Sequence, residues 1–354
     1  MGLFSKSKSL IGLDVGSSAI KAVELKEQKG GSFGLVHLGL EEIPTEAIVD
    51  GTILDSALVI ESIQTLMTKN RIKTTDVATA VSGNAVIVKK IQLPTMSDEE
   101  LAESIQWEAE QYIPFDIGDV SIDYQVMGHS ATEEKNMDVL LVAVKRDKIN
   151  DYTSVITQAG RSPVIMDVDS FALQNCYEVN YGFTSGEVVA LINIGASIIN
   201  ITMINDGSSI FWRDVSIGGN QYTDSIMKEL NLSFDQADQL KRGYQVEGVS
   251  MDQAQPVIEQ VSQDIATETQ KTFDFFIATS SSDHIDRIAL AGGCSKVANL
   301  DSIMSDKFSV PVELIDPFKN IEFNPKDFDP EDLRDIAPSF AVAVGLALRK
   351  VGDS

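Results

Sequence analysis

A glycine–serine turn near the N-terminus, within the sequence SLIGLDVGSSAIKAVEL, combines residue types that bind phosphate groups. Gly16 lacks the Cβ that would keep an anion from the backbone, and Ser17 and Ser18 add hydroxyl donors beside exposed N–H groups. Lys21 adds a positive charge, and Asp14 could hold Mg²⁺ through water, because this ion keeps most of its hydration shell. An ordinary hairpin turn is the alternative, since a single short motif also occurs by chance.

The same pattern occurs again near the middle of the chain. Residues 189–204, VALINIGASIINITMI, align without gaps to the first segment, so that Asn193 falls on Asp14 and Gly195 on Gly16. The other candidate phosphate contacts of this second turn are Ala196 and Ser197. Similarity at about half the chain length indicates a duplicated domain rather than a short repeat. Two such turns facing each other would form a clamp for phosphate groups.

Two glycine pairs later in the chain could also approach a nucleotide. Gly218 and Gly219 precede a helix expected at residues 221–230, so N–H groups at its start are available to an anion, and a tight turn is the alternative. A strand at residues 288–291 is followed at once by a second glycine pair and a helix start, where a backbone can lie against a ribose or phosphate. The candidate residues of this second junction are Gly292, Gly293, Cys294 and Ser295.

Composition and charge exclude several classes of function. The 354 residues, 43% of them hydrophobic, can form two sizeable domains, each with its own core. A net charge of −25 argues against nonspecific nucleic-acid binding and against wide contact with an anionic membrane. Three unclustered histidines and two distant cysteines argue against a zinc site and a histidine-based triad. We expect a soluble, cytoplasmic protein whose first eight residues are a disordered leader, with a weak membrane or partner contact as the alternative.

The elements expected around the turns place them in an α/β protein with an insertion. After the first hairpin, the pattern predicts a strand, a helix and a strand at residues 33–41, 55–68 and 77–81. The pattern then changes to strand, helix, strand, strand and helix, at residues 85–93, from Ser97 onward, and at 120–126, 137–144 and 148–159. The helix that follows Ser97 begins with a capping box and carries Leu101, Ile105 and residues 107–109 on its apolar side. This block indicates an inserted subdomain.

The rest of the chain returns to the first domain and then builds the second. A strand at residues 163–168 and a helix at 171–179 complete the first half. A long helix at residues 255–278 carries an apolar stripe typical of a core. We expect the acidic residues 316–335 to form a surface loop, and residues 338–348 to form a closing helix. The predicted domains are residues 1–82 with 162–185, the inserted subdomain 83–161, and residues 186–354.

The order of these parts resembles the actin-like ATPase superfamily, whose fold is a pair of ribonuclease H-like domains. Within it, essentially the whole chain resembles the PilM family of type IV pilus assembly proteins. The residues that carry this resemblance are QWEAEQYIPFDI at 106–117, QAGRSPVIMDVDSFAL at 158–173 and AVAVGLALR at 341–349. The position of the inserted α+β subdomain, inside the first half, also resembles PilM and the cell-division protein FtsA rather than actin.

The resemblance implies that ATP binds between the two domains. It implies a first phosphate element at Asp14 to Ser18, a second at Asn193 to Ser197, an adenosine element at Ala291 to Ser295, and Lys241 near the adenine. It also implies two connecting helices, at residues 171–179 and 338–348. No other carboxylate than Asp14 stands out as a catalytic base. Asn193 departs from the Asp of many hydrolysing relatives, and an amide cannot take a proton from water. The sequence therefore predicts ATP binding with weak or negligible hydrolysis.

The resemblance further implies a cytoplasmic adaptor at the inner face of the inner membrane, held there through its partners and serving type IV pilus biogenesis and twitching motility. Such proteins bind the N-terminal cytoplasmic tail of PilN in a groove between the first domain and its insert. Our candidates for this groove are Tyr112, Ile113, Pro114 and Phe115, with packing of the insert as their alternative function. Contacts with pilus motor ATPases and a homo-oligomer are compatible with the resemblance. The alternatives are an FtsA-like filament-forming or membrane-associated protein and a sugar or acetate kinase of the same fold.

Overall fold

Two hairpins with the same strand register form the centres of two sheets in the computed structural model, which describes residues 10–129, 135–280 and 282–352. The strands are β1 Ile11–Val15 and β2 Ala19–Glu27 in the first hairpin, and β11 Val188–Ile194 and β12 Ile199–Asn205 in the second. Asp14 pairs with Lys21 in one hairpin, and Asn193 pairs with Asn200 in the other. The two pairs occupy matching places in the aligned segments, so the predicted duplication extends to the register.

The two sheets repeat the same strand order. The first sheet runs β10-β6-β1-β2-β3-β16, and the second, reversed, runs β15-β14-β11-β12-β13. The remaining strands are β3 Phe33–Glu42, β6 Asp76–Val81, β10 Ser162–Val168, β13 Ser208–Val215, β14 Arg287–Ala291, β15 Val312–Leu314 and β16 Ile321–Glu322. In each sheet a parallel strand lies beside the first strand of the hairpin. This order confirms the predicted duplicated α/β fold.

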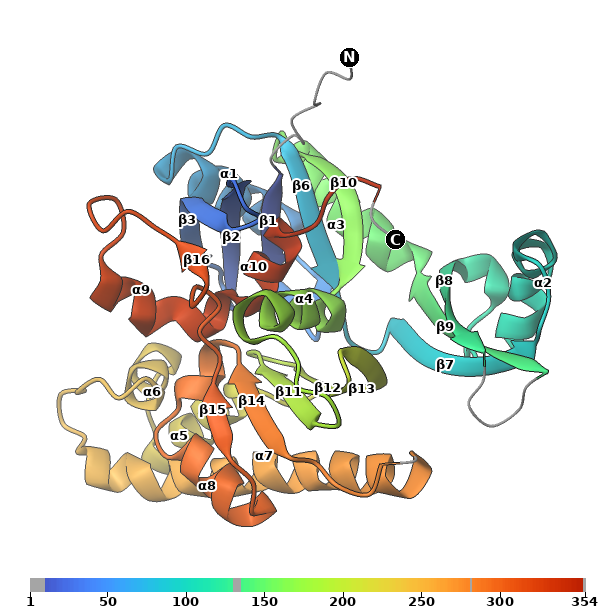
Figure 1. Cartoon of the computed structure of the whole chain (residues 1–354). Coiled ribbons are helices and arrows are strands. Elements are labelled where there is room, and N and C mark those ends of the chain that lie inside the picture. Colours follow the sequence, from blue (N-terminus) through green and yellow to red (C-terminus); the bar gives the residue numbers. More distant parts are fainter. Residues whose placement is uncertain (1–9, 130–134, 281, 353–354) are drawn as a thin grey trace.

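Helices cover both sheets and fill the space between them (Figure 1). The outer face of the first sheet packs on α1 Ser56–Lys69 and α3 Arg146–Gln158, and that of the second on α5 Gly219–Leu230, α6 Phe234–Lys241, α7 Met251–Thr279 and α8 Leu300–Phe308. Two helices, α4 Asp169–Tyr181 and α10 Ala341–Ala347, lie between the sheets and share one core with both. The short helix η3 Ala337–Phe340 leads into α10.

The packing of α10 depends on residues without large side chains. A Cβ added to Gly345 would overlap the backbone of Ala172 in α4, and one added to Gly12 in β1 would overlap the carbonyl of Ala343. The backbones of α10, α4 and β1 therefore lie in direct contact. This contact fixes the distance between the two connecting helices and the first sheet.

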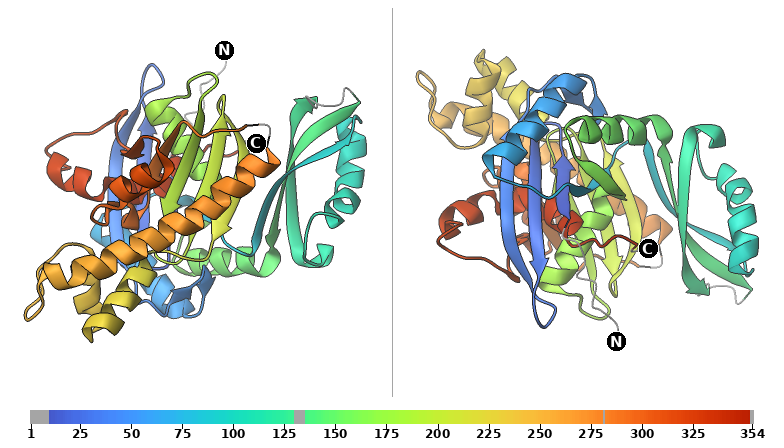
Figure 2. Two further views of the ribbon diagram at one scale, coloured as in Figure 1. Left: turned by 90° about the horizontal axis from the view of Figure 1, so that it is seen from below. Right: turned by 90° about the horizontal axis from the view of Figure 1, so that it is seen from above.

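A third, smaller sheet projects from one side of the molecule (Figure 2). It has the order β7-β9-β8 and is covered by one helix. Its elements are β7 Val86–Pro94, α2 Asp98–Glu110, η1 Ile117–Asp119, β8 Val120–His129 and β9 Asn136–Lys145. The predicted capping box of α2 is present, formed by Ser97 and Glu100. The prediction that Trp107 lies on the apolar side of α2 is wrong, because its side chain is 75% exposed.

The packing of two segments favours other domain boundaries than the sequence did. The buried residues of α3, among them Tyr152 and Val155, share one core with β1, β6 and α1, and the small sheet adds only Val86, Val142 and Val144 to it. We therefore propose that the insert spans residues 83–145. Residues 316–335 are more than the predicted surface loop, because they contain β16 and the helix α9 Pro330–Ile336. Since β16 pairs with β3, this late segment belongs with the first sheet.

The structure does not test the expected N-terminal leader, and it contains a short hairpin that the sequence did not predict. The leader expected at residues 1–8 lies outside the described residues. A two-stranded sheet of β4 Ile48–Val49 and β5 Thr52–Ile53, which the sequence did not predict, stands near the start of the insert. Across residues 10–129, 135–280 and 282–352, no helix combines the length and apolar character that a membrane span requires.

We predict that Gly345→Ala destabilises the fold by about 1–3 kcal/mol, the usual cost of overpacking, because the new Cβ would push α10 away from Ala172. Urea unfolding measures this change. The control is Gly293→Ala, since a Cβ at Gly293 would meet no atom within 4 Å. Equal stability of the two variants would contradict the close contact of the helices.

Candidate functional site

The two glycine–serine turns lie opposite each other, at the carboxyl ends of the central strands β1 and β11. The hydroxyl oxygens of Ser17 and Ser197 are 2.8 Å apart. In each turn the glycine N–H donates to the carbonyl three residues later, at 3.3 Å for Gly16 and 3.0 Å for Gly195. The turns therefore have the same local geometry, and their hydroxyls converge on one point. A phosphate group between them would meet donors from both halves of the chain.

Asp14 and Lys21 form a largely buried ion pair beside the first turn. Lys21 Nζ donates to Asp14 Oδ2 at 3.0 Å, and the two residues are directly opposite in the hairpin. The ammonium group lies 3.5 Å from the position that a Cβ of Gly16 would take. The hairpin thus places one positive and one negative charge next to the turn, where a phosphate and a hydrated metal ion could each find a partner.

Asp169, which the sequence analysis missed, lies close to this pair. It is the first residue of α4 and follows β10 directly, and β1, β6 and β10 are parallel, so their carboxyl ends meet at one edge. Burial, and then the charge of Asp14, raise the pKa of Asp169 to about 7, against a hydrogen bond from Ser82. The signal was available, because an acidic residue directly after a parallel strand belongs at this edge.

Lys148 supplies a second positive charge near Asp169 and Asp214. Its Nζ donates to the carbonyl of Ser82 at 2.6 Å and to that of Gly51 at 3.1 Å. Burial lowers the pKa of Lys148, and the charges of Asp169 and Asp214 counteract this effect. The lysine therefore joins α3, the end of β6 and the β4–β5 hairpin at one point.

The second turn differs from the first in its hydrogen bonds. Asn193, the counterpart of Asp14, donates from Nδ2 to Asn200 Oδ1 at 2.9 Å, where the first hairpin has its ion pair. Asn200 in turn donates to Asp214 Oδ1 at 2.8 Å. The negative charge on this side therefore belongs to Asp214 of β13, one strand away from the turn.

The prediction that free N–H groups at the start of α5 are available to an anion is wrong for its first two amides. The N–H of Gly219 donates to the carbonyl of Gly195 at 2.9 Å, and that of Asn220 donates to Ala196 at 2.8 Å. A Cβ at Gly218 would lie 2.6 Å from the same Gly195 carbonyl. The glycine pair therefore docks the helix on the second turn and brings its backbone close to Ala196.

The second glycine junction lies against the same turn. Gly292 has a φ of +92°, and a Cβ there would lie 2.7 Å from Asn193 Oδ1. Gly293 begins a short helix, η2 Gly293–Lys296. The longer helix expected at this junction, α8, begins only at Leu300. Cys294 is buried against Gly219, and burial raises the pKa of its thiol. Ser295 is buried too, and its hydroxyl donates to the carbonyl of Gly292 at 2.8 Å.

Lys241 lies near this junction, on α6. Its Nζ donates to Thr223 at 3.0 Å and pairs with Asp238 at 2.5 Å. It is close enough to influence the thiol of Cys294. The neighbouring Arg242 pairs with Glu42 of the first half at 2.8 Å. The structure thus gathers the residues expected around a nucleotide along the facing edges of the two halves.

The four candidates for the partner groove differ in their exposure. Ile113 is buried in the core of the insert, whereas Pro114 is exposed. Lys89 lies over the ring of Tyr112 at 5.0 Å, and Lys145 lies over the ring of Phe115 at 4.3 Å. A cavity of about 330 Å³ lies at the junction of insert and first half, lined by Asp50, Gly51, Thr52, Ile53, Asn84, Ala85, Lys145, Asp147, Lys148, Asp151 and Tyr152. Phe115 is connected to this cavity through Lys145.

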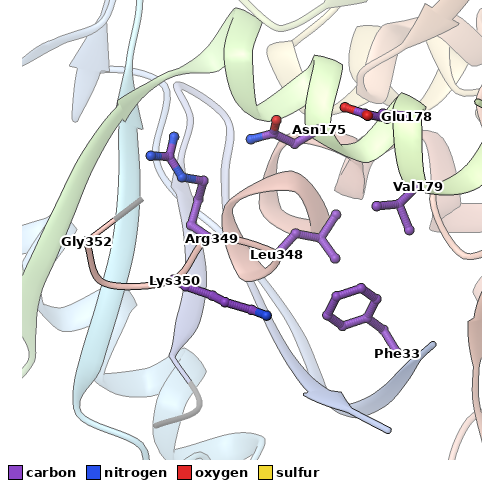
Figure 3. A pocket seen from close by; sticks show the side chains of 8 residues that line it. All are labelled: Phe33, Asn175, Glu178, Val179, Leu348, Arg349, Lys350 and Gly352. Atoms are coloured by element: carbon purple, nitrogen blue, oxygen red, sulfur yellow. The ribbon is translucent and has the colours of Figure 1, made fainter. Parts of the chain in front are cut away.

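A larger cavity, of about 570 Å³, lies between the start of β3, one face of α4 and the segment after α10 (Figure 3). Its lining residues are Phe33, Asn175, Glu178, Val179, Leu348, Arg349, Lys350 and Gly352. Arg349 pairs with Asp167, and Lys350 pairs with Glu27. None of the residues that the sequence predicted for a site lines this cavity.

A metal site built from protein side chains alone is not found among residues 10–129, 135–280 and 282–352, where no three His, Cys, Asp or Glu side chains are grouped for one. A magnesium ion that keeps its waters needs few carboxylates. The role of Asp14 toward such an ion stays a prediction.

Comparisons with known proteins agree with this architecture. The family described as type IV pilus assembly protein PilM matches residues 12–351. The solved PilM-PilN type IV pilus biogenesis complex contains a chain that is 29% identical, with a TM-score of 0.85, covering 98% of this chain and 100% of that one. EutJ from Carboxydothermus hydrogenoformans (14% identical, TM-score 0.59, 96% and 89% covered) and ADP-bound MreB5 of Spiroplasma citri (13%, 0.51, 96% and 95%) share the fold.

Among curated proteins, the cell division protein FtsA of Staphylococcus epidermidis is 25% identical over 302 residues. The match covers 75% of this chain and 62% of FtsA. The chain therefore spans less than two thirds of the length of that relative.

We predict that Asp169→Asn stabilises the protein more at pH 8 than at pH 5. The raised pKa means that ionising Asp169 costs stability as pH rises from its unfolded value toward about 7, and asparagine avoids this cost. The gain in Tm should grow by roughly 2–4 °C between these two pH values. Thermal unfolding measures it, with the exposed Asp306→Asn as control. A gain that is the same at both pH values would contradict a raised pKa.

Proposed function

The chain belongs to the type IV pilus assembly protein PilM family, and from this premise we propose that it is an ATP-binding adaptor that holds the cytoplasmic N-terminal tail of PilN. The single observation that best supports this function is the match over 98% of the chain to a chain of the solved PilM-PilN complex. The proposal places the protein at the inner face of the inner membrane, through its partner. Contacts with motor ATPases and self-association are further parts of this proposal.

The residues at the facing edges fit a nucleotide. The hydroxyls of Ser17 and Ser197 converge from the two halves, with Lys21 beside the first turn. At Gly218 and Gly292 any side chain would fill the space next to the second turn. These features support ATP between the halves, with phosphates at the turns and the base toward Lys241 and the Gly292 junction. Asp14 would hold a magnesium ion through its waters.

We propose that hydrolysis is weak or negligible. Asn193 cannot accept a proton from water, and its amide is engaged with Asn200. Asp169, whose pKa the charge of Asp14 helps to raise, is the carboxylate we propose as a base if any hydrolysis occurs. Robust multiple-turnover phosphate release by the pure protein would contradict this part of the proposal. If slow release is found, Asp169→Asn should abolish it.

The cavity at the junction of the insert supports the binding of a peptide tail. It lies where the chain passes from the first half to the insert and back, with apolar wall from Ile53, Ala85 and Tyr152. Its lining also carries exposed charged groups of both signs, among them Asp147 and Lys145. A site of this kind can hold apolar side chains while it binds the backbone and polar groups of a tail.

The second candidate function is that of an FtsA-like filament protein, which the partial match to FtsA favours. Sedimentation with ATP, with and without liposomes, distinguishes the two. An adaptor stays in the supernatant unless its partner is present, whereas a filament protein pellets with ATP.

We predict that Lys21→Ala weakens ATP binding about tenfold, because a charge-assisted hydrogen bond contributes about 1.5–3 kcal/mol. Titration with a fluorescent ATP analogue measures the Kd. The matched control is Lys69→Ala, which removes an exposed lysine of α1 that pairs with Glu41. Equal affinity of both variants would place the phosphates elsewhere.

We predict that Thr52→Trp weakens the binding of a PilN tail peptide more than tenfold. Thr52 is exposed and lines the junction cavity, so the indole would fill the cavity at little cost to the fold. Fluorescence anisotropy of a labelled peptide measures this Kd. Thr68→Trp on α1, which does not line the cavity, should bind as the native protein does. Unchanged binding by Thr52→Trp would exclude the cavity as the groove.

A further inference from the structure

The chain enters the insert at Gly83, and this residue is held by the opposite half of the molecule. Gly83 lies between β6 and β7 and has a φ of +84°, a conformation that glycine adopts readily. Its N–H donates to Asp214 Oδ2 at 2.5 Å, across the gap between β13 and the insert. Gly83, which we call the pivot of the insert, is therefore held by a carboxylate from the second half.

The same carboxylate is connected to the second turn. Asp214 Oδ1 accepts from Asn200, and Asn200 Oδ1 accepts from Asn193. Every group in this series uses a distinct atom, so the hydrogen bonds run without interruption from Asn193 to Gly83. A change in the position of Asn193 would alter the geometry available to the Gly83 amide.

A packing contact connects the same two places independently. Ile198, the last residue of the second turn, lies against the pivot, because a Cβ on Gly83 would be 2.9 Å from its Cδ1. A Cβ on Gly51 would be 3.6 Å from the same atom. Any larger residue at Gly83 would therefore displace Ile198. The second turn touches the pivot through both a side chain and a series of hydrogen bonds.

Of the two glycines that Ile198 approaches, Gly51 belongs to the wall of the junction cavity and Gly83 directly precedes residues of that wall. Gly51 lines it directly, and Asn84 and Ala85, the residues after the pivot, line it too. Lys148, which also lines the cavity, donates to the carbonyls of Gly51 and of Ser82, the residue before Gly83. A shift of Gly83 would therefore change the shape of the cavity.

We propose that Asp214 couples the second turn to the junction cavity, so that a nucleotide phosphate at the turn strengthens binding of the partner peptide. This inference rests on the proposed function, since it assigns regulation to its two sites. A phosphate at Gly195 to Ser197 would fix Ile198 and Asn193. The wall of the cavity would then be ordered before the peptide arrives, and binding would cost less conformational entropy. By linkage, the peptide strengthens nucleotide binding by the same factor.

The test measures the Kd of a labelled PilN tail peptide for the full chain, with and without magnesium and a non-hydrolysable ATP analogue. We expect the analogue to tighten peptide binding by about fivefold or more in the native protein, within the usual range of coupling between sites. In Asp214→Ala the coupling ratio, which is the peptide Kd without the analogue divided by the Kd with it, should fall below about twofold. Asp306→Ala, which removes an exposed carboxylate of α8, should keep the native ratio.

Ile198→Ala provides a second variant in case Asp214→Ala does not fold, and its ratio should also fall, because the packing contact is lost. Thermal unfolding identifies the folded variants. If both ligands bind the native protein but the ratio is one, the coupling is wrong and the adaptor function stands. If folded Asp214→Ala keeps the coupling ratio of the native protein, Asp214 does not couple the two sites, and the inference is also overturned. If the native protein binds no peptide, both the inference and the proposed function fail.

Discussion

The close contact of α10 with α4 and β1 is the constraint on which the arrangement of the two halves depends. Gly345 lies against the backbone of Ala172, and Gly12 lies against Ala343, so these elements approach to a distance that no side chain would permit. Both connecting helices share a core with the two sheets. Because the helices cannot separate without losing this packing, the carboxyl-terminal edges of the sheets face each other, and the two turns meet.

The consequence of that arrangement is a concentration of charge at the facing edges. The first half contributes the pair of Asp14 and Lys21, together with Asp169, and the second half contributes Asp214. Burial raises the pKa of both Asp169 and Asp214. Carboxylates kept partly from water in this way are expensive for a fold, and such groups are typical of sites that bind ligands. The nucleotide site that we propose therefore contains residues whose burial also affects the stability of the fold.

The sequence predicted the repeated parts of this fold well, because repetition is a signal that does not depend on tertiary packing. The alignment of Asn193 with Asp14 implied the shared register that the hairpins have. The sequence could not show where α3 packs, since its apolar face fits either sheet, and it could not show that β16 pairs with β3. Trp107 was misplaced because the buried face of α2 follows Leu101, Ile105 and Ala109, each four residues apart. At α5, the sequence showed the glycines but not the carbonyls of the second turn that occupy the amides.

The central claim is that the two halves close on one nucleotide, while the outer surface and the junction cavity serve partner binding. A crystal structure of the full chain grown with magnesium and a non-hydrolysable ATP analogue tests this claim most directly. The account predicts phosphate density between the turns at Gly16 and Gly195, with the hydroxyls of Ser17 and Ser197 turned to it rather than to each other. A nucleotide bound elsewhere, or a gap between the turns that stays closed and empty at saturating analogue, would contradict it.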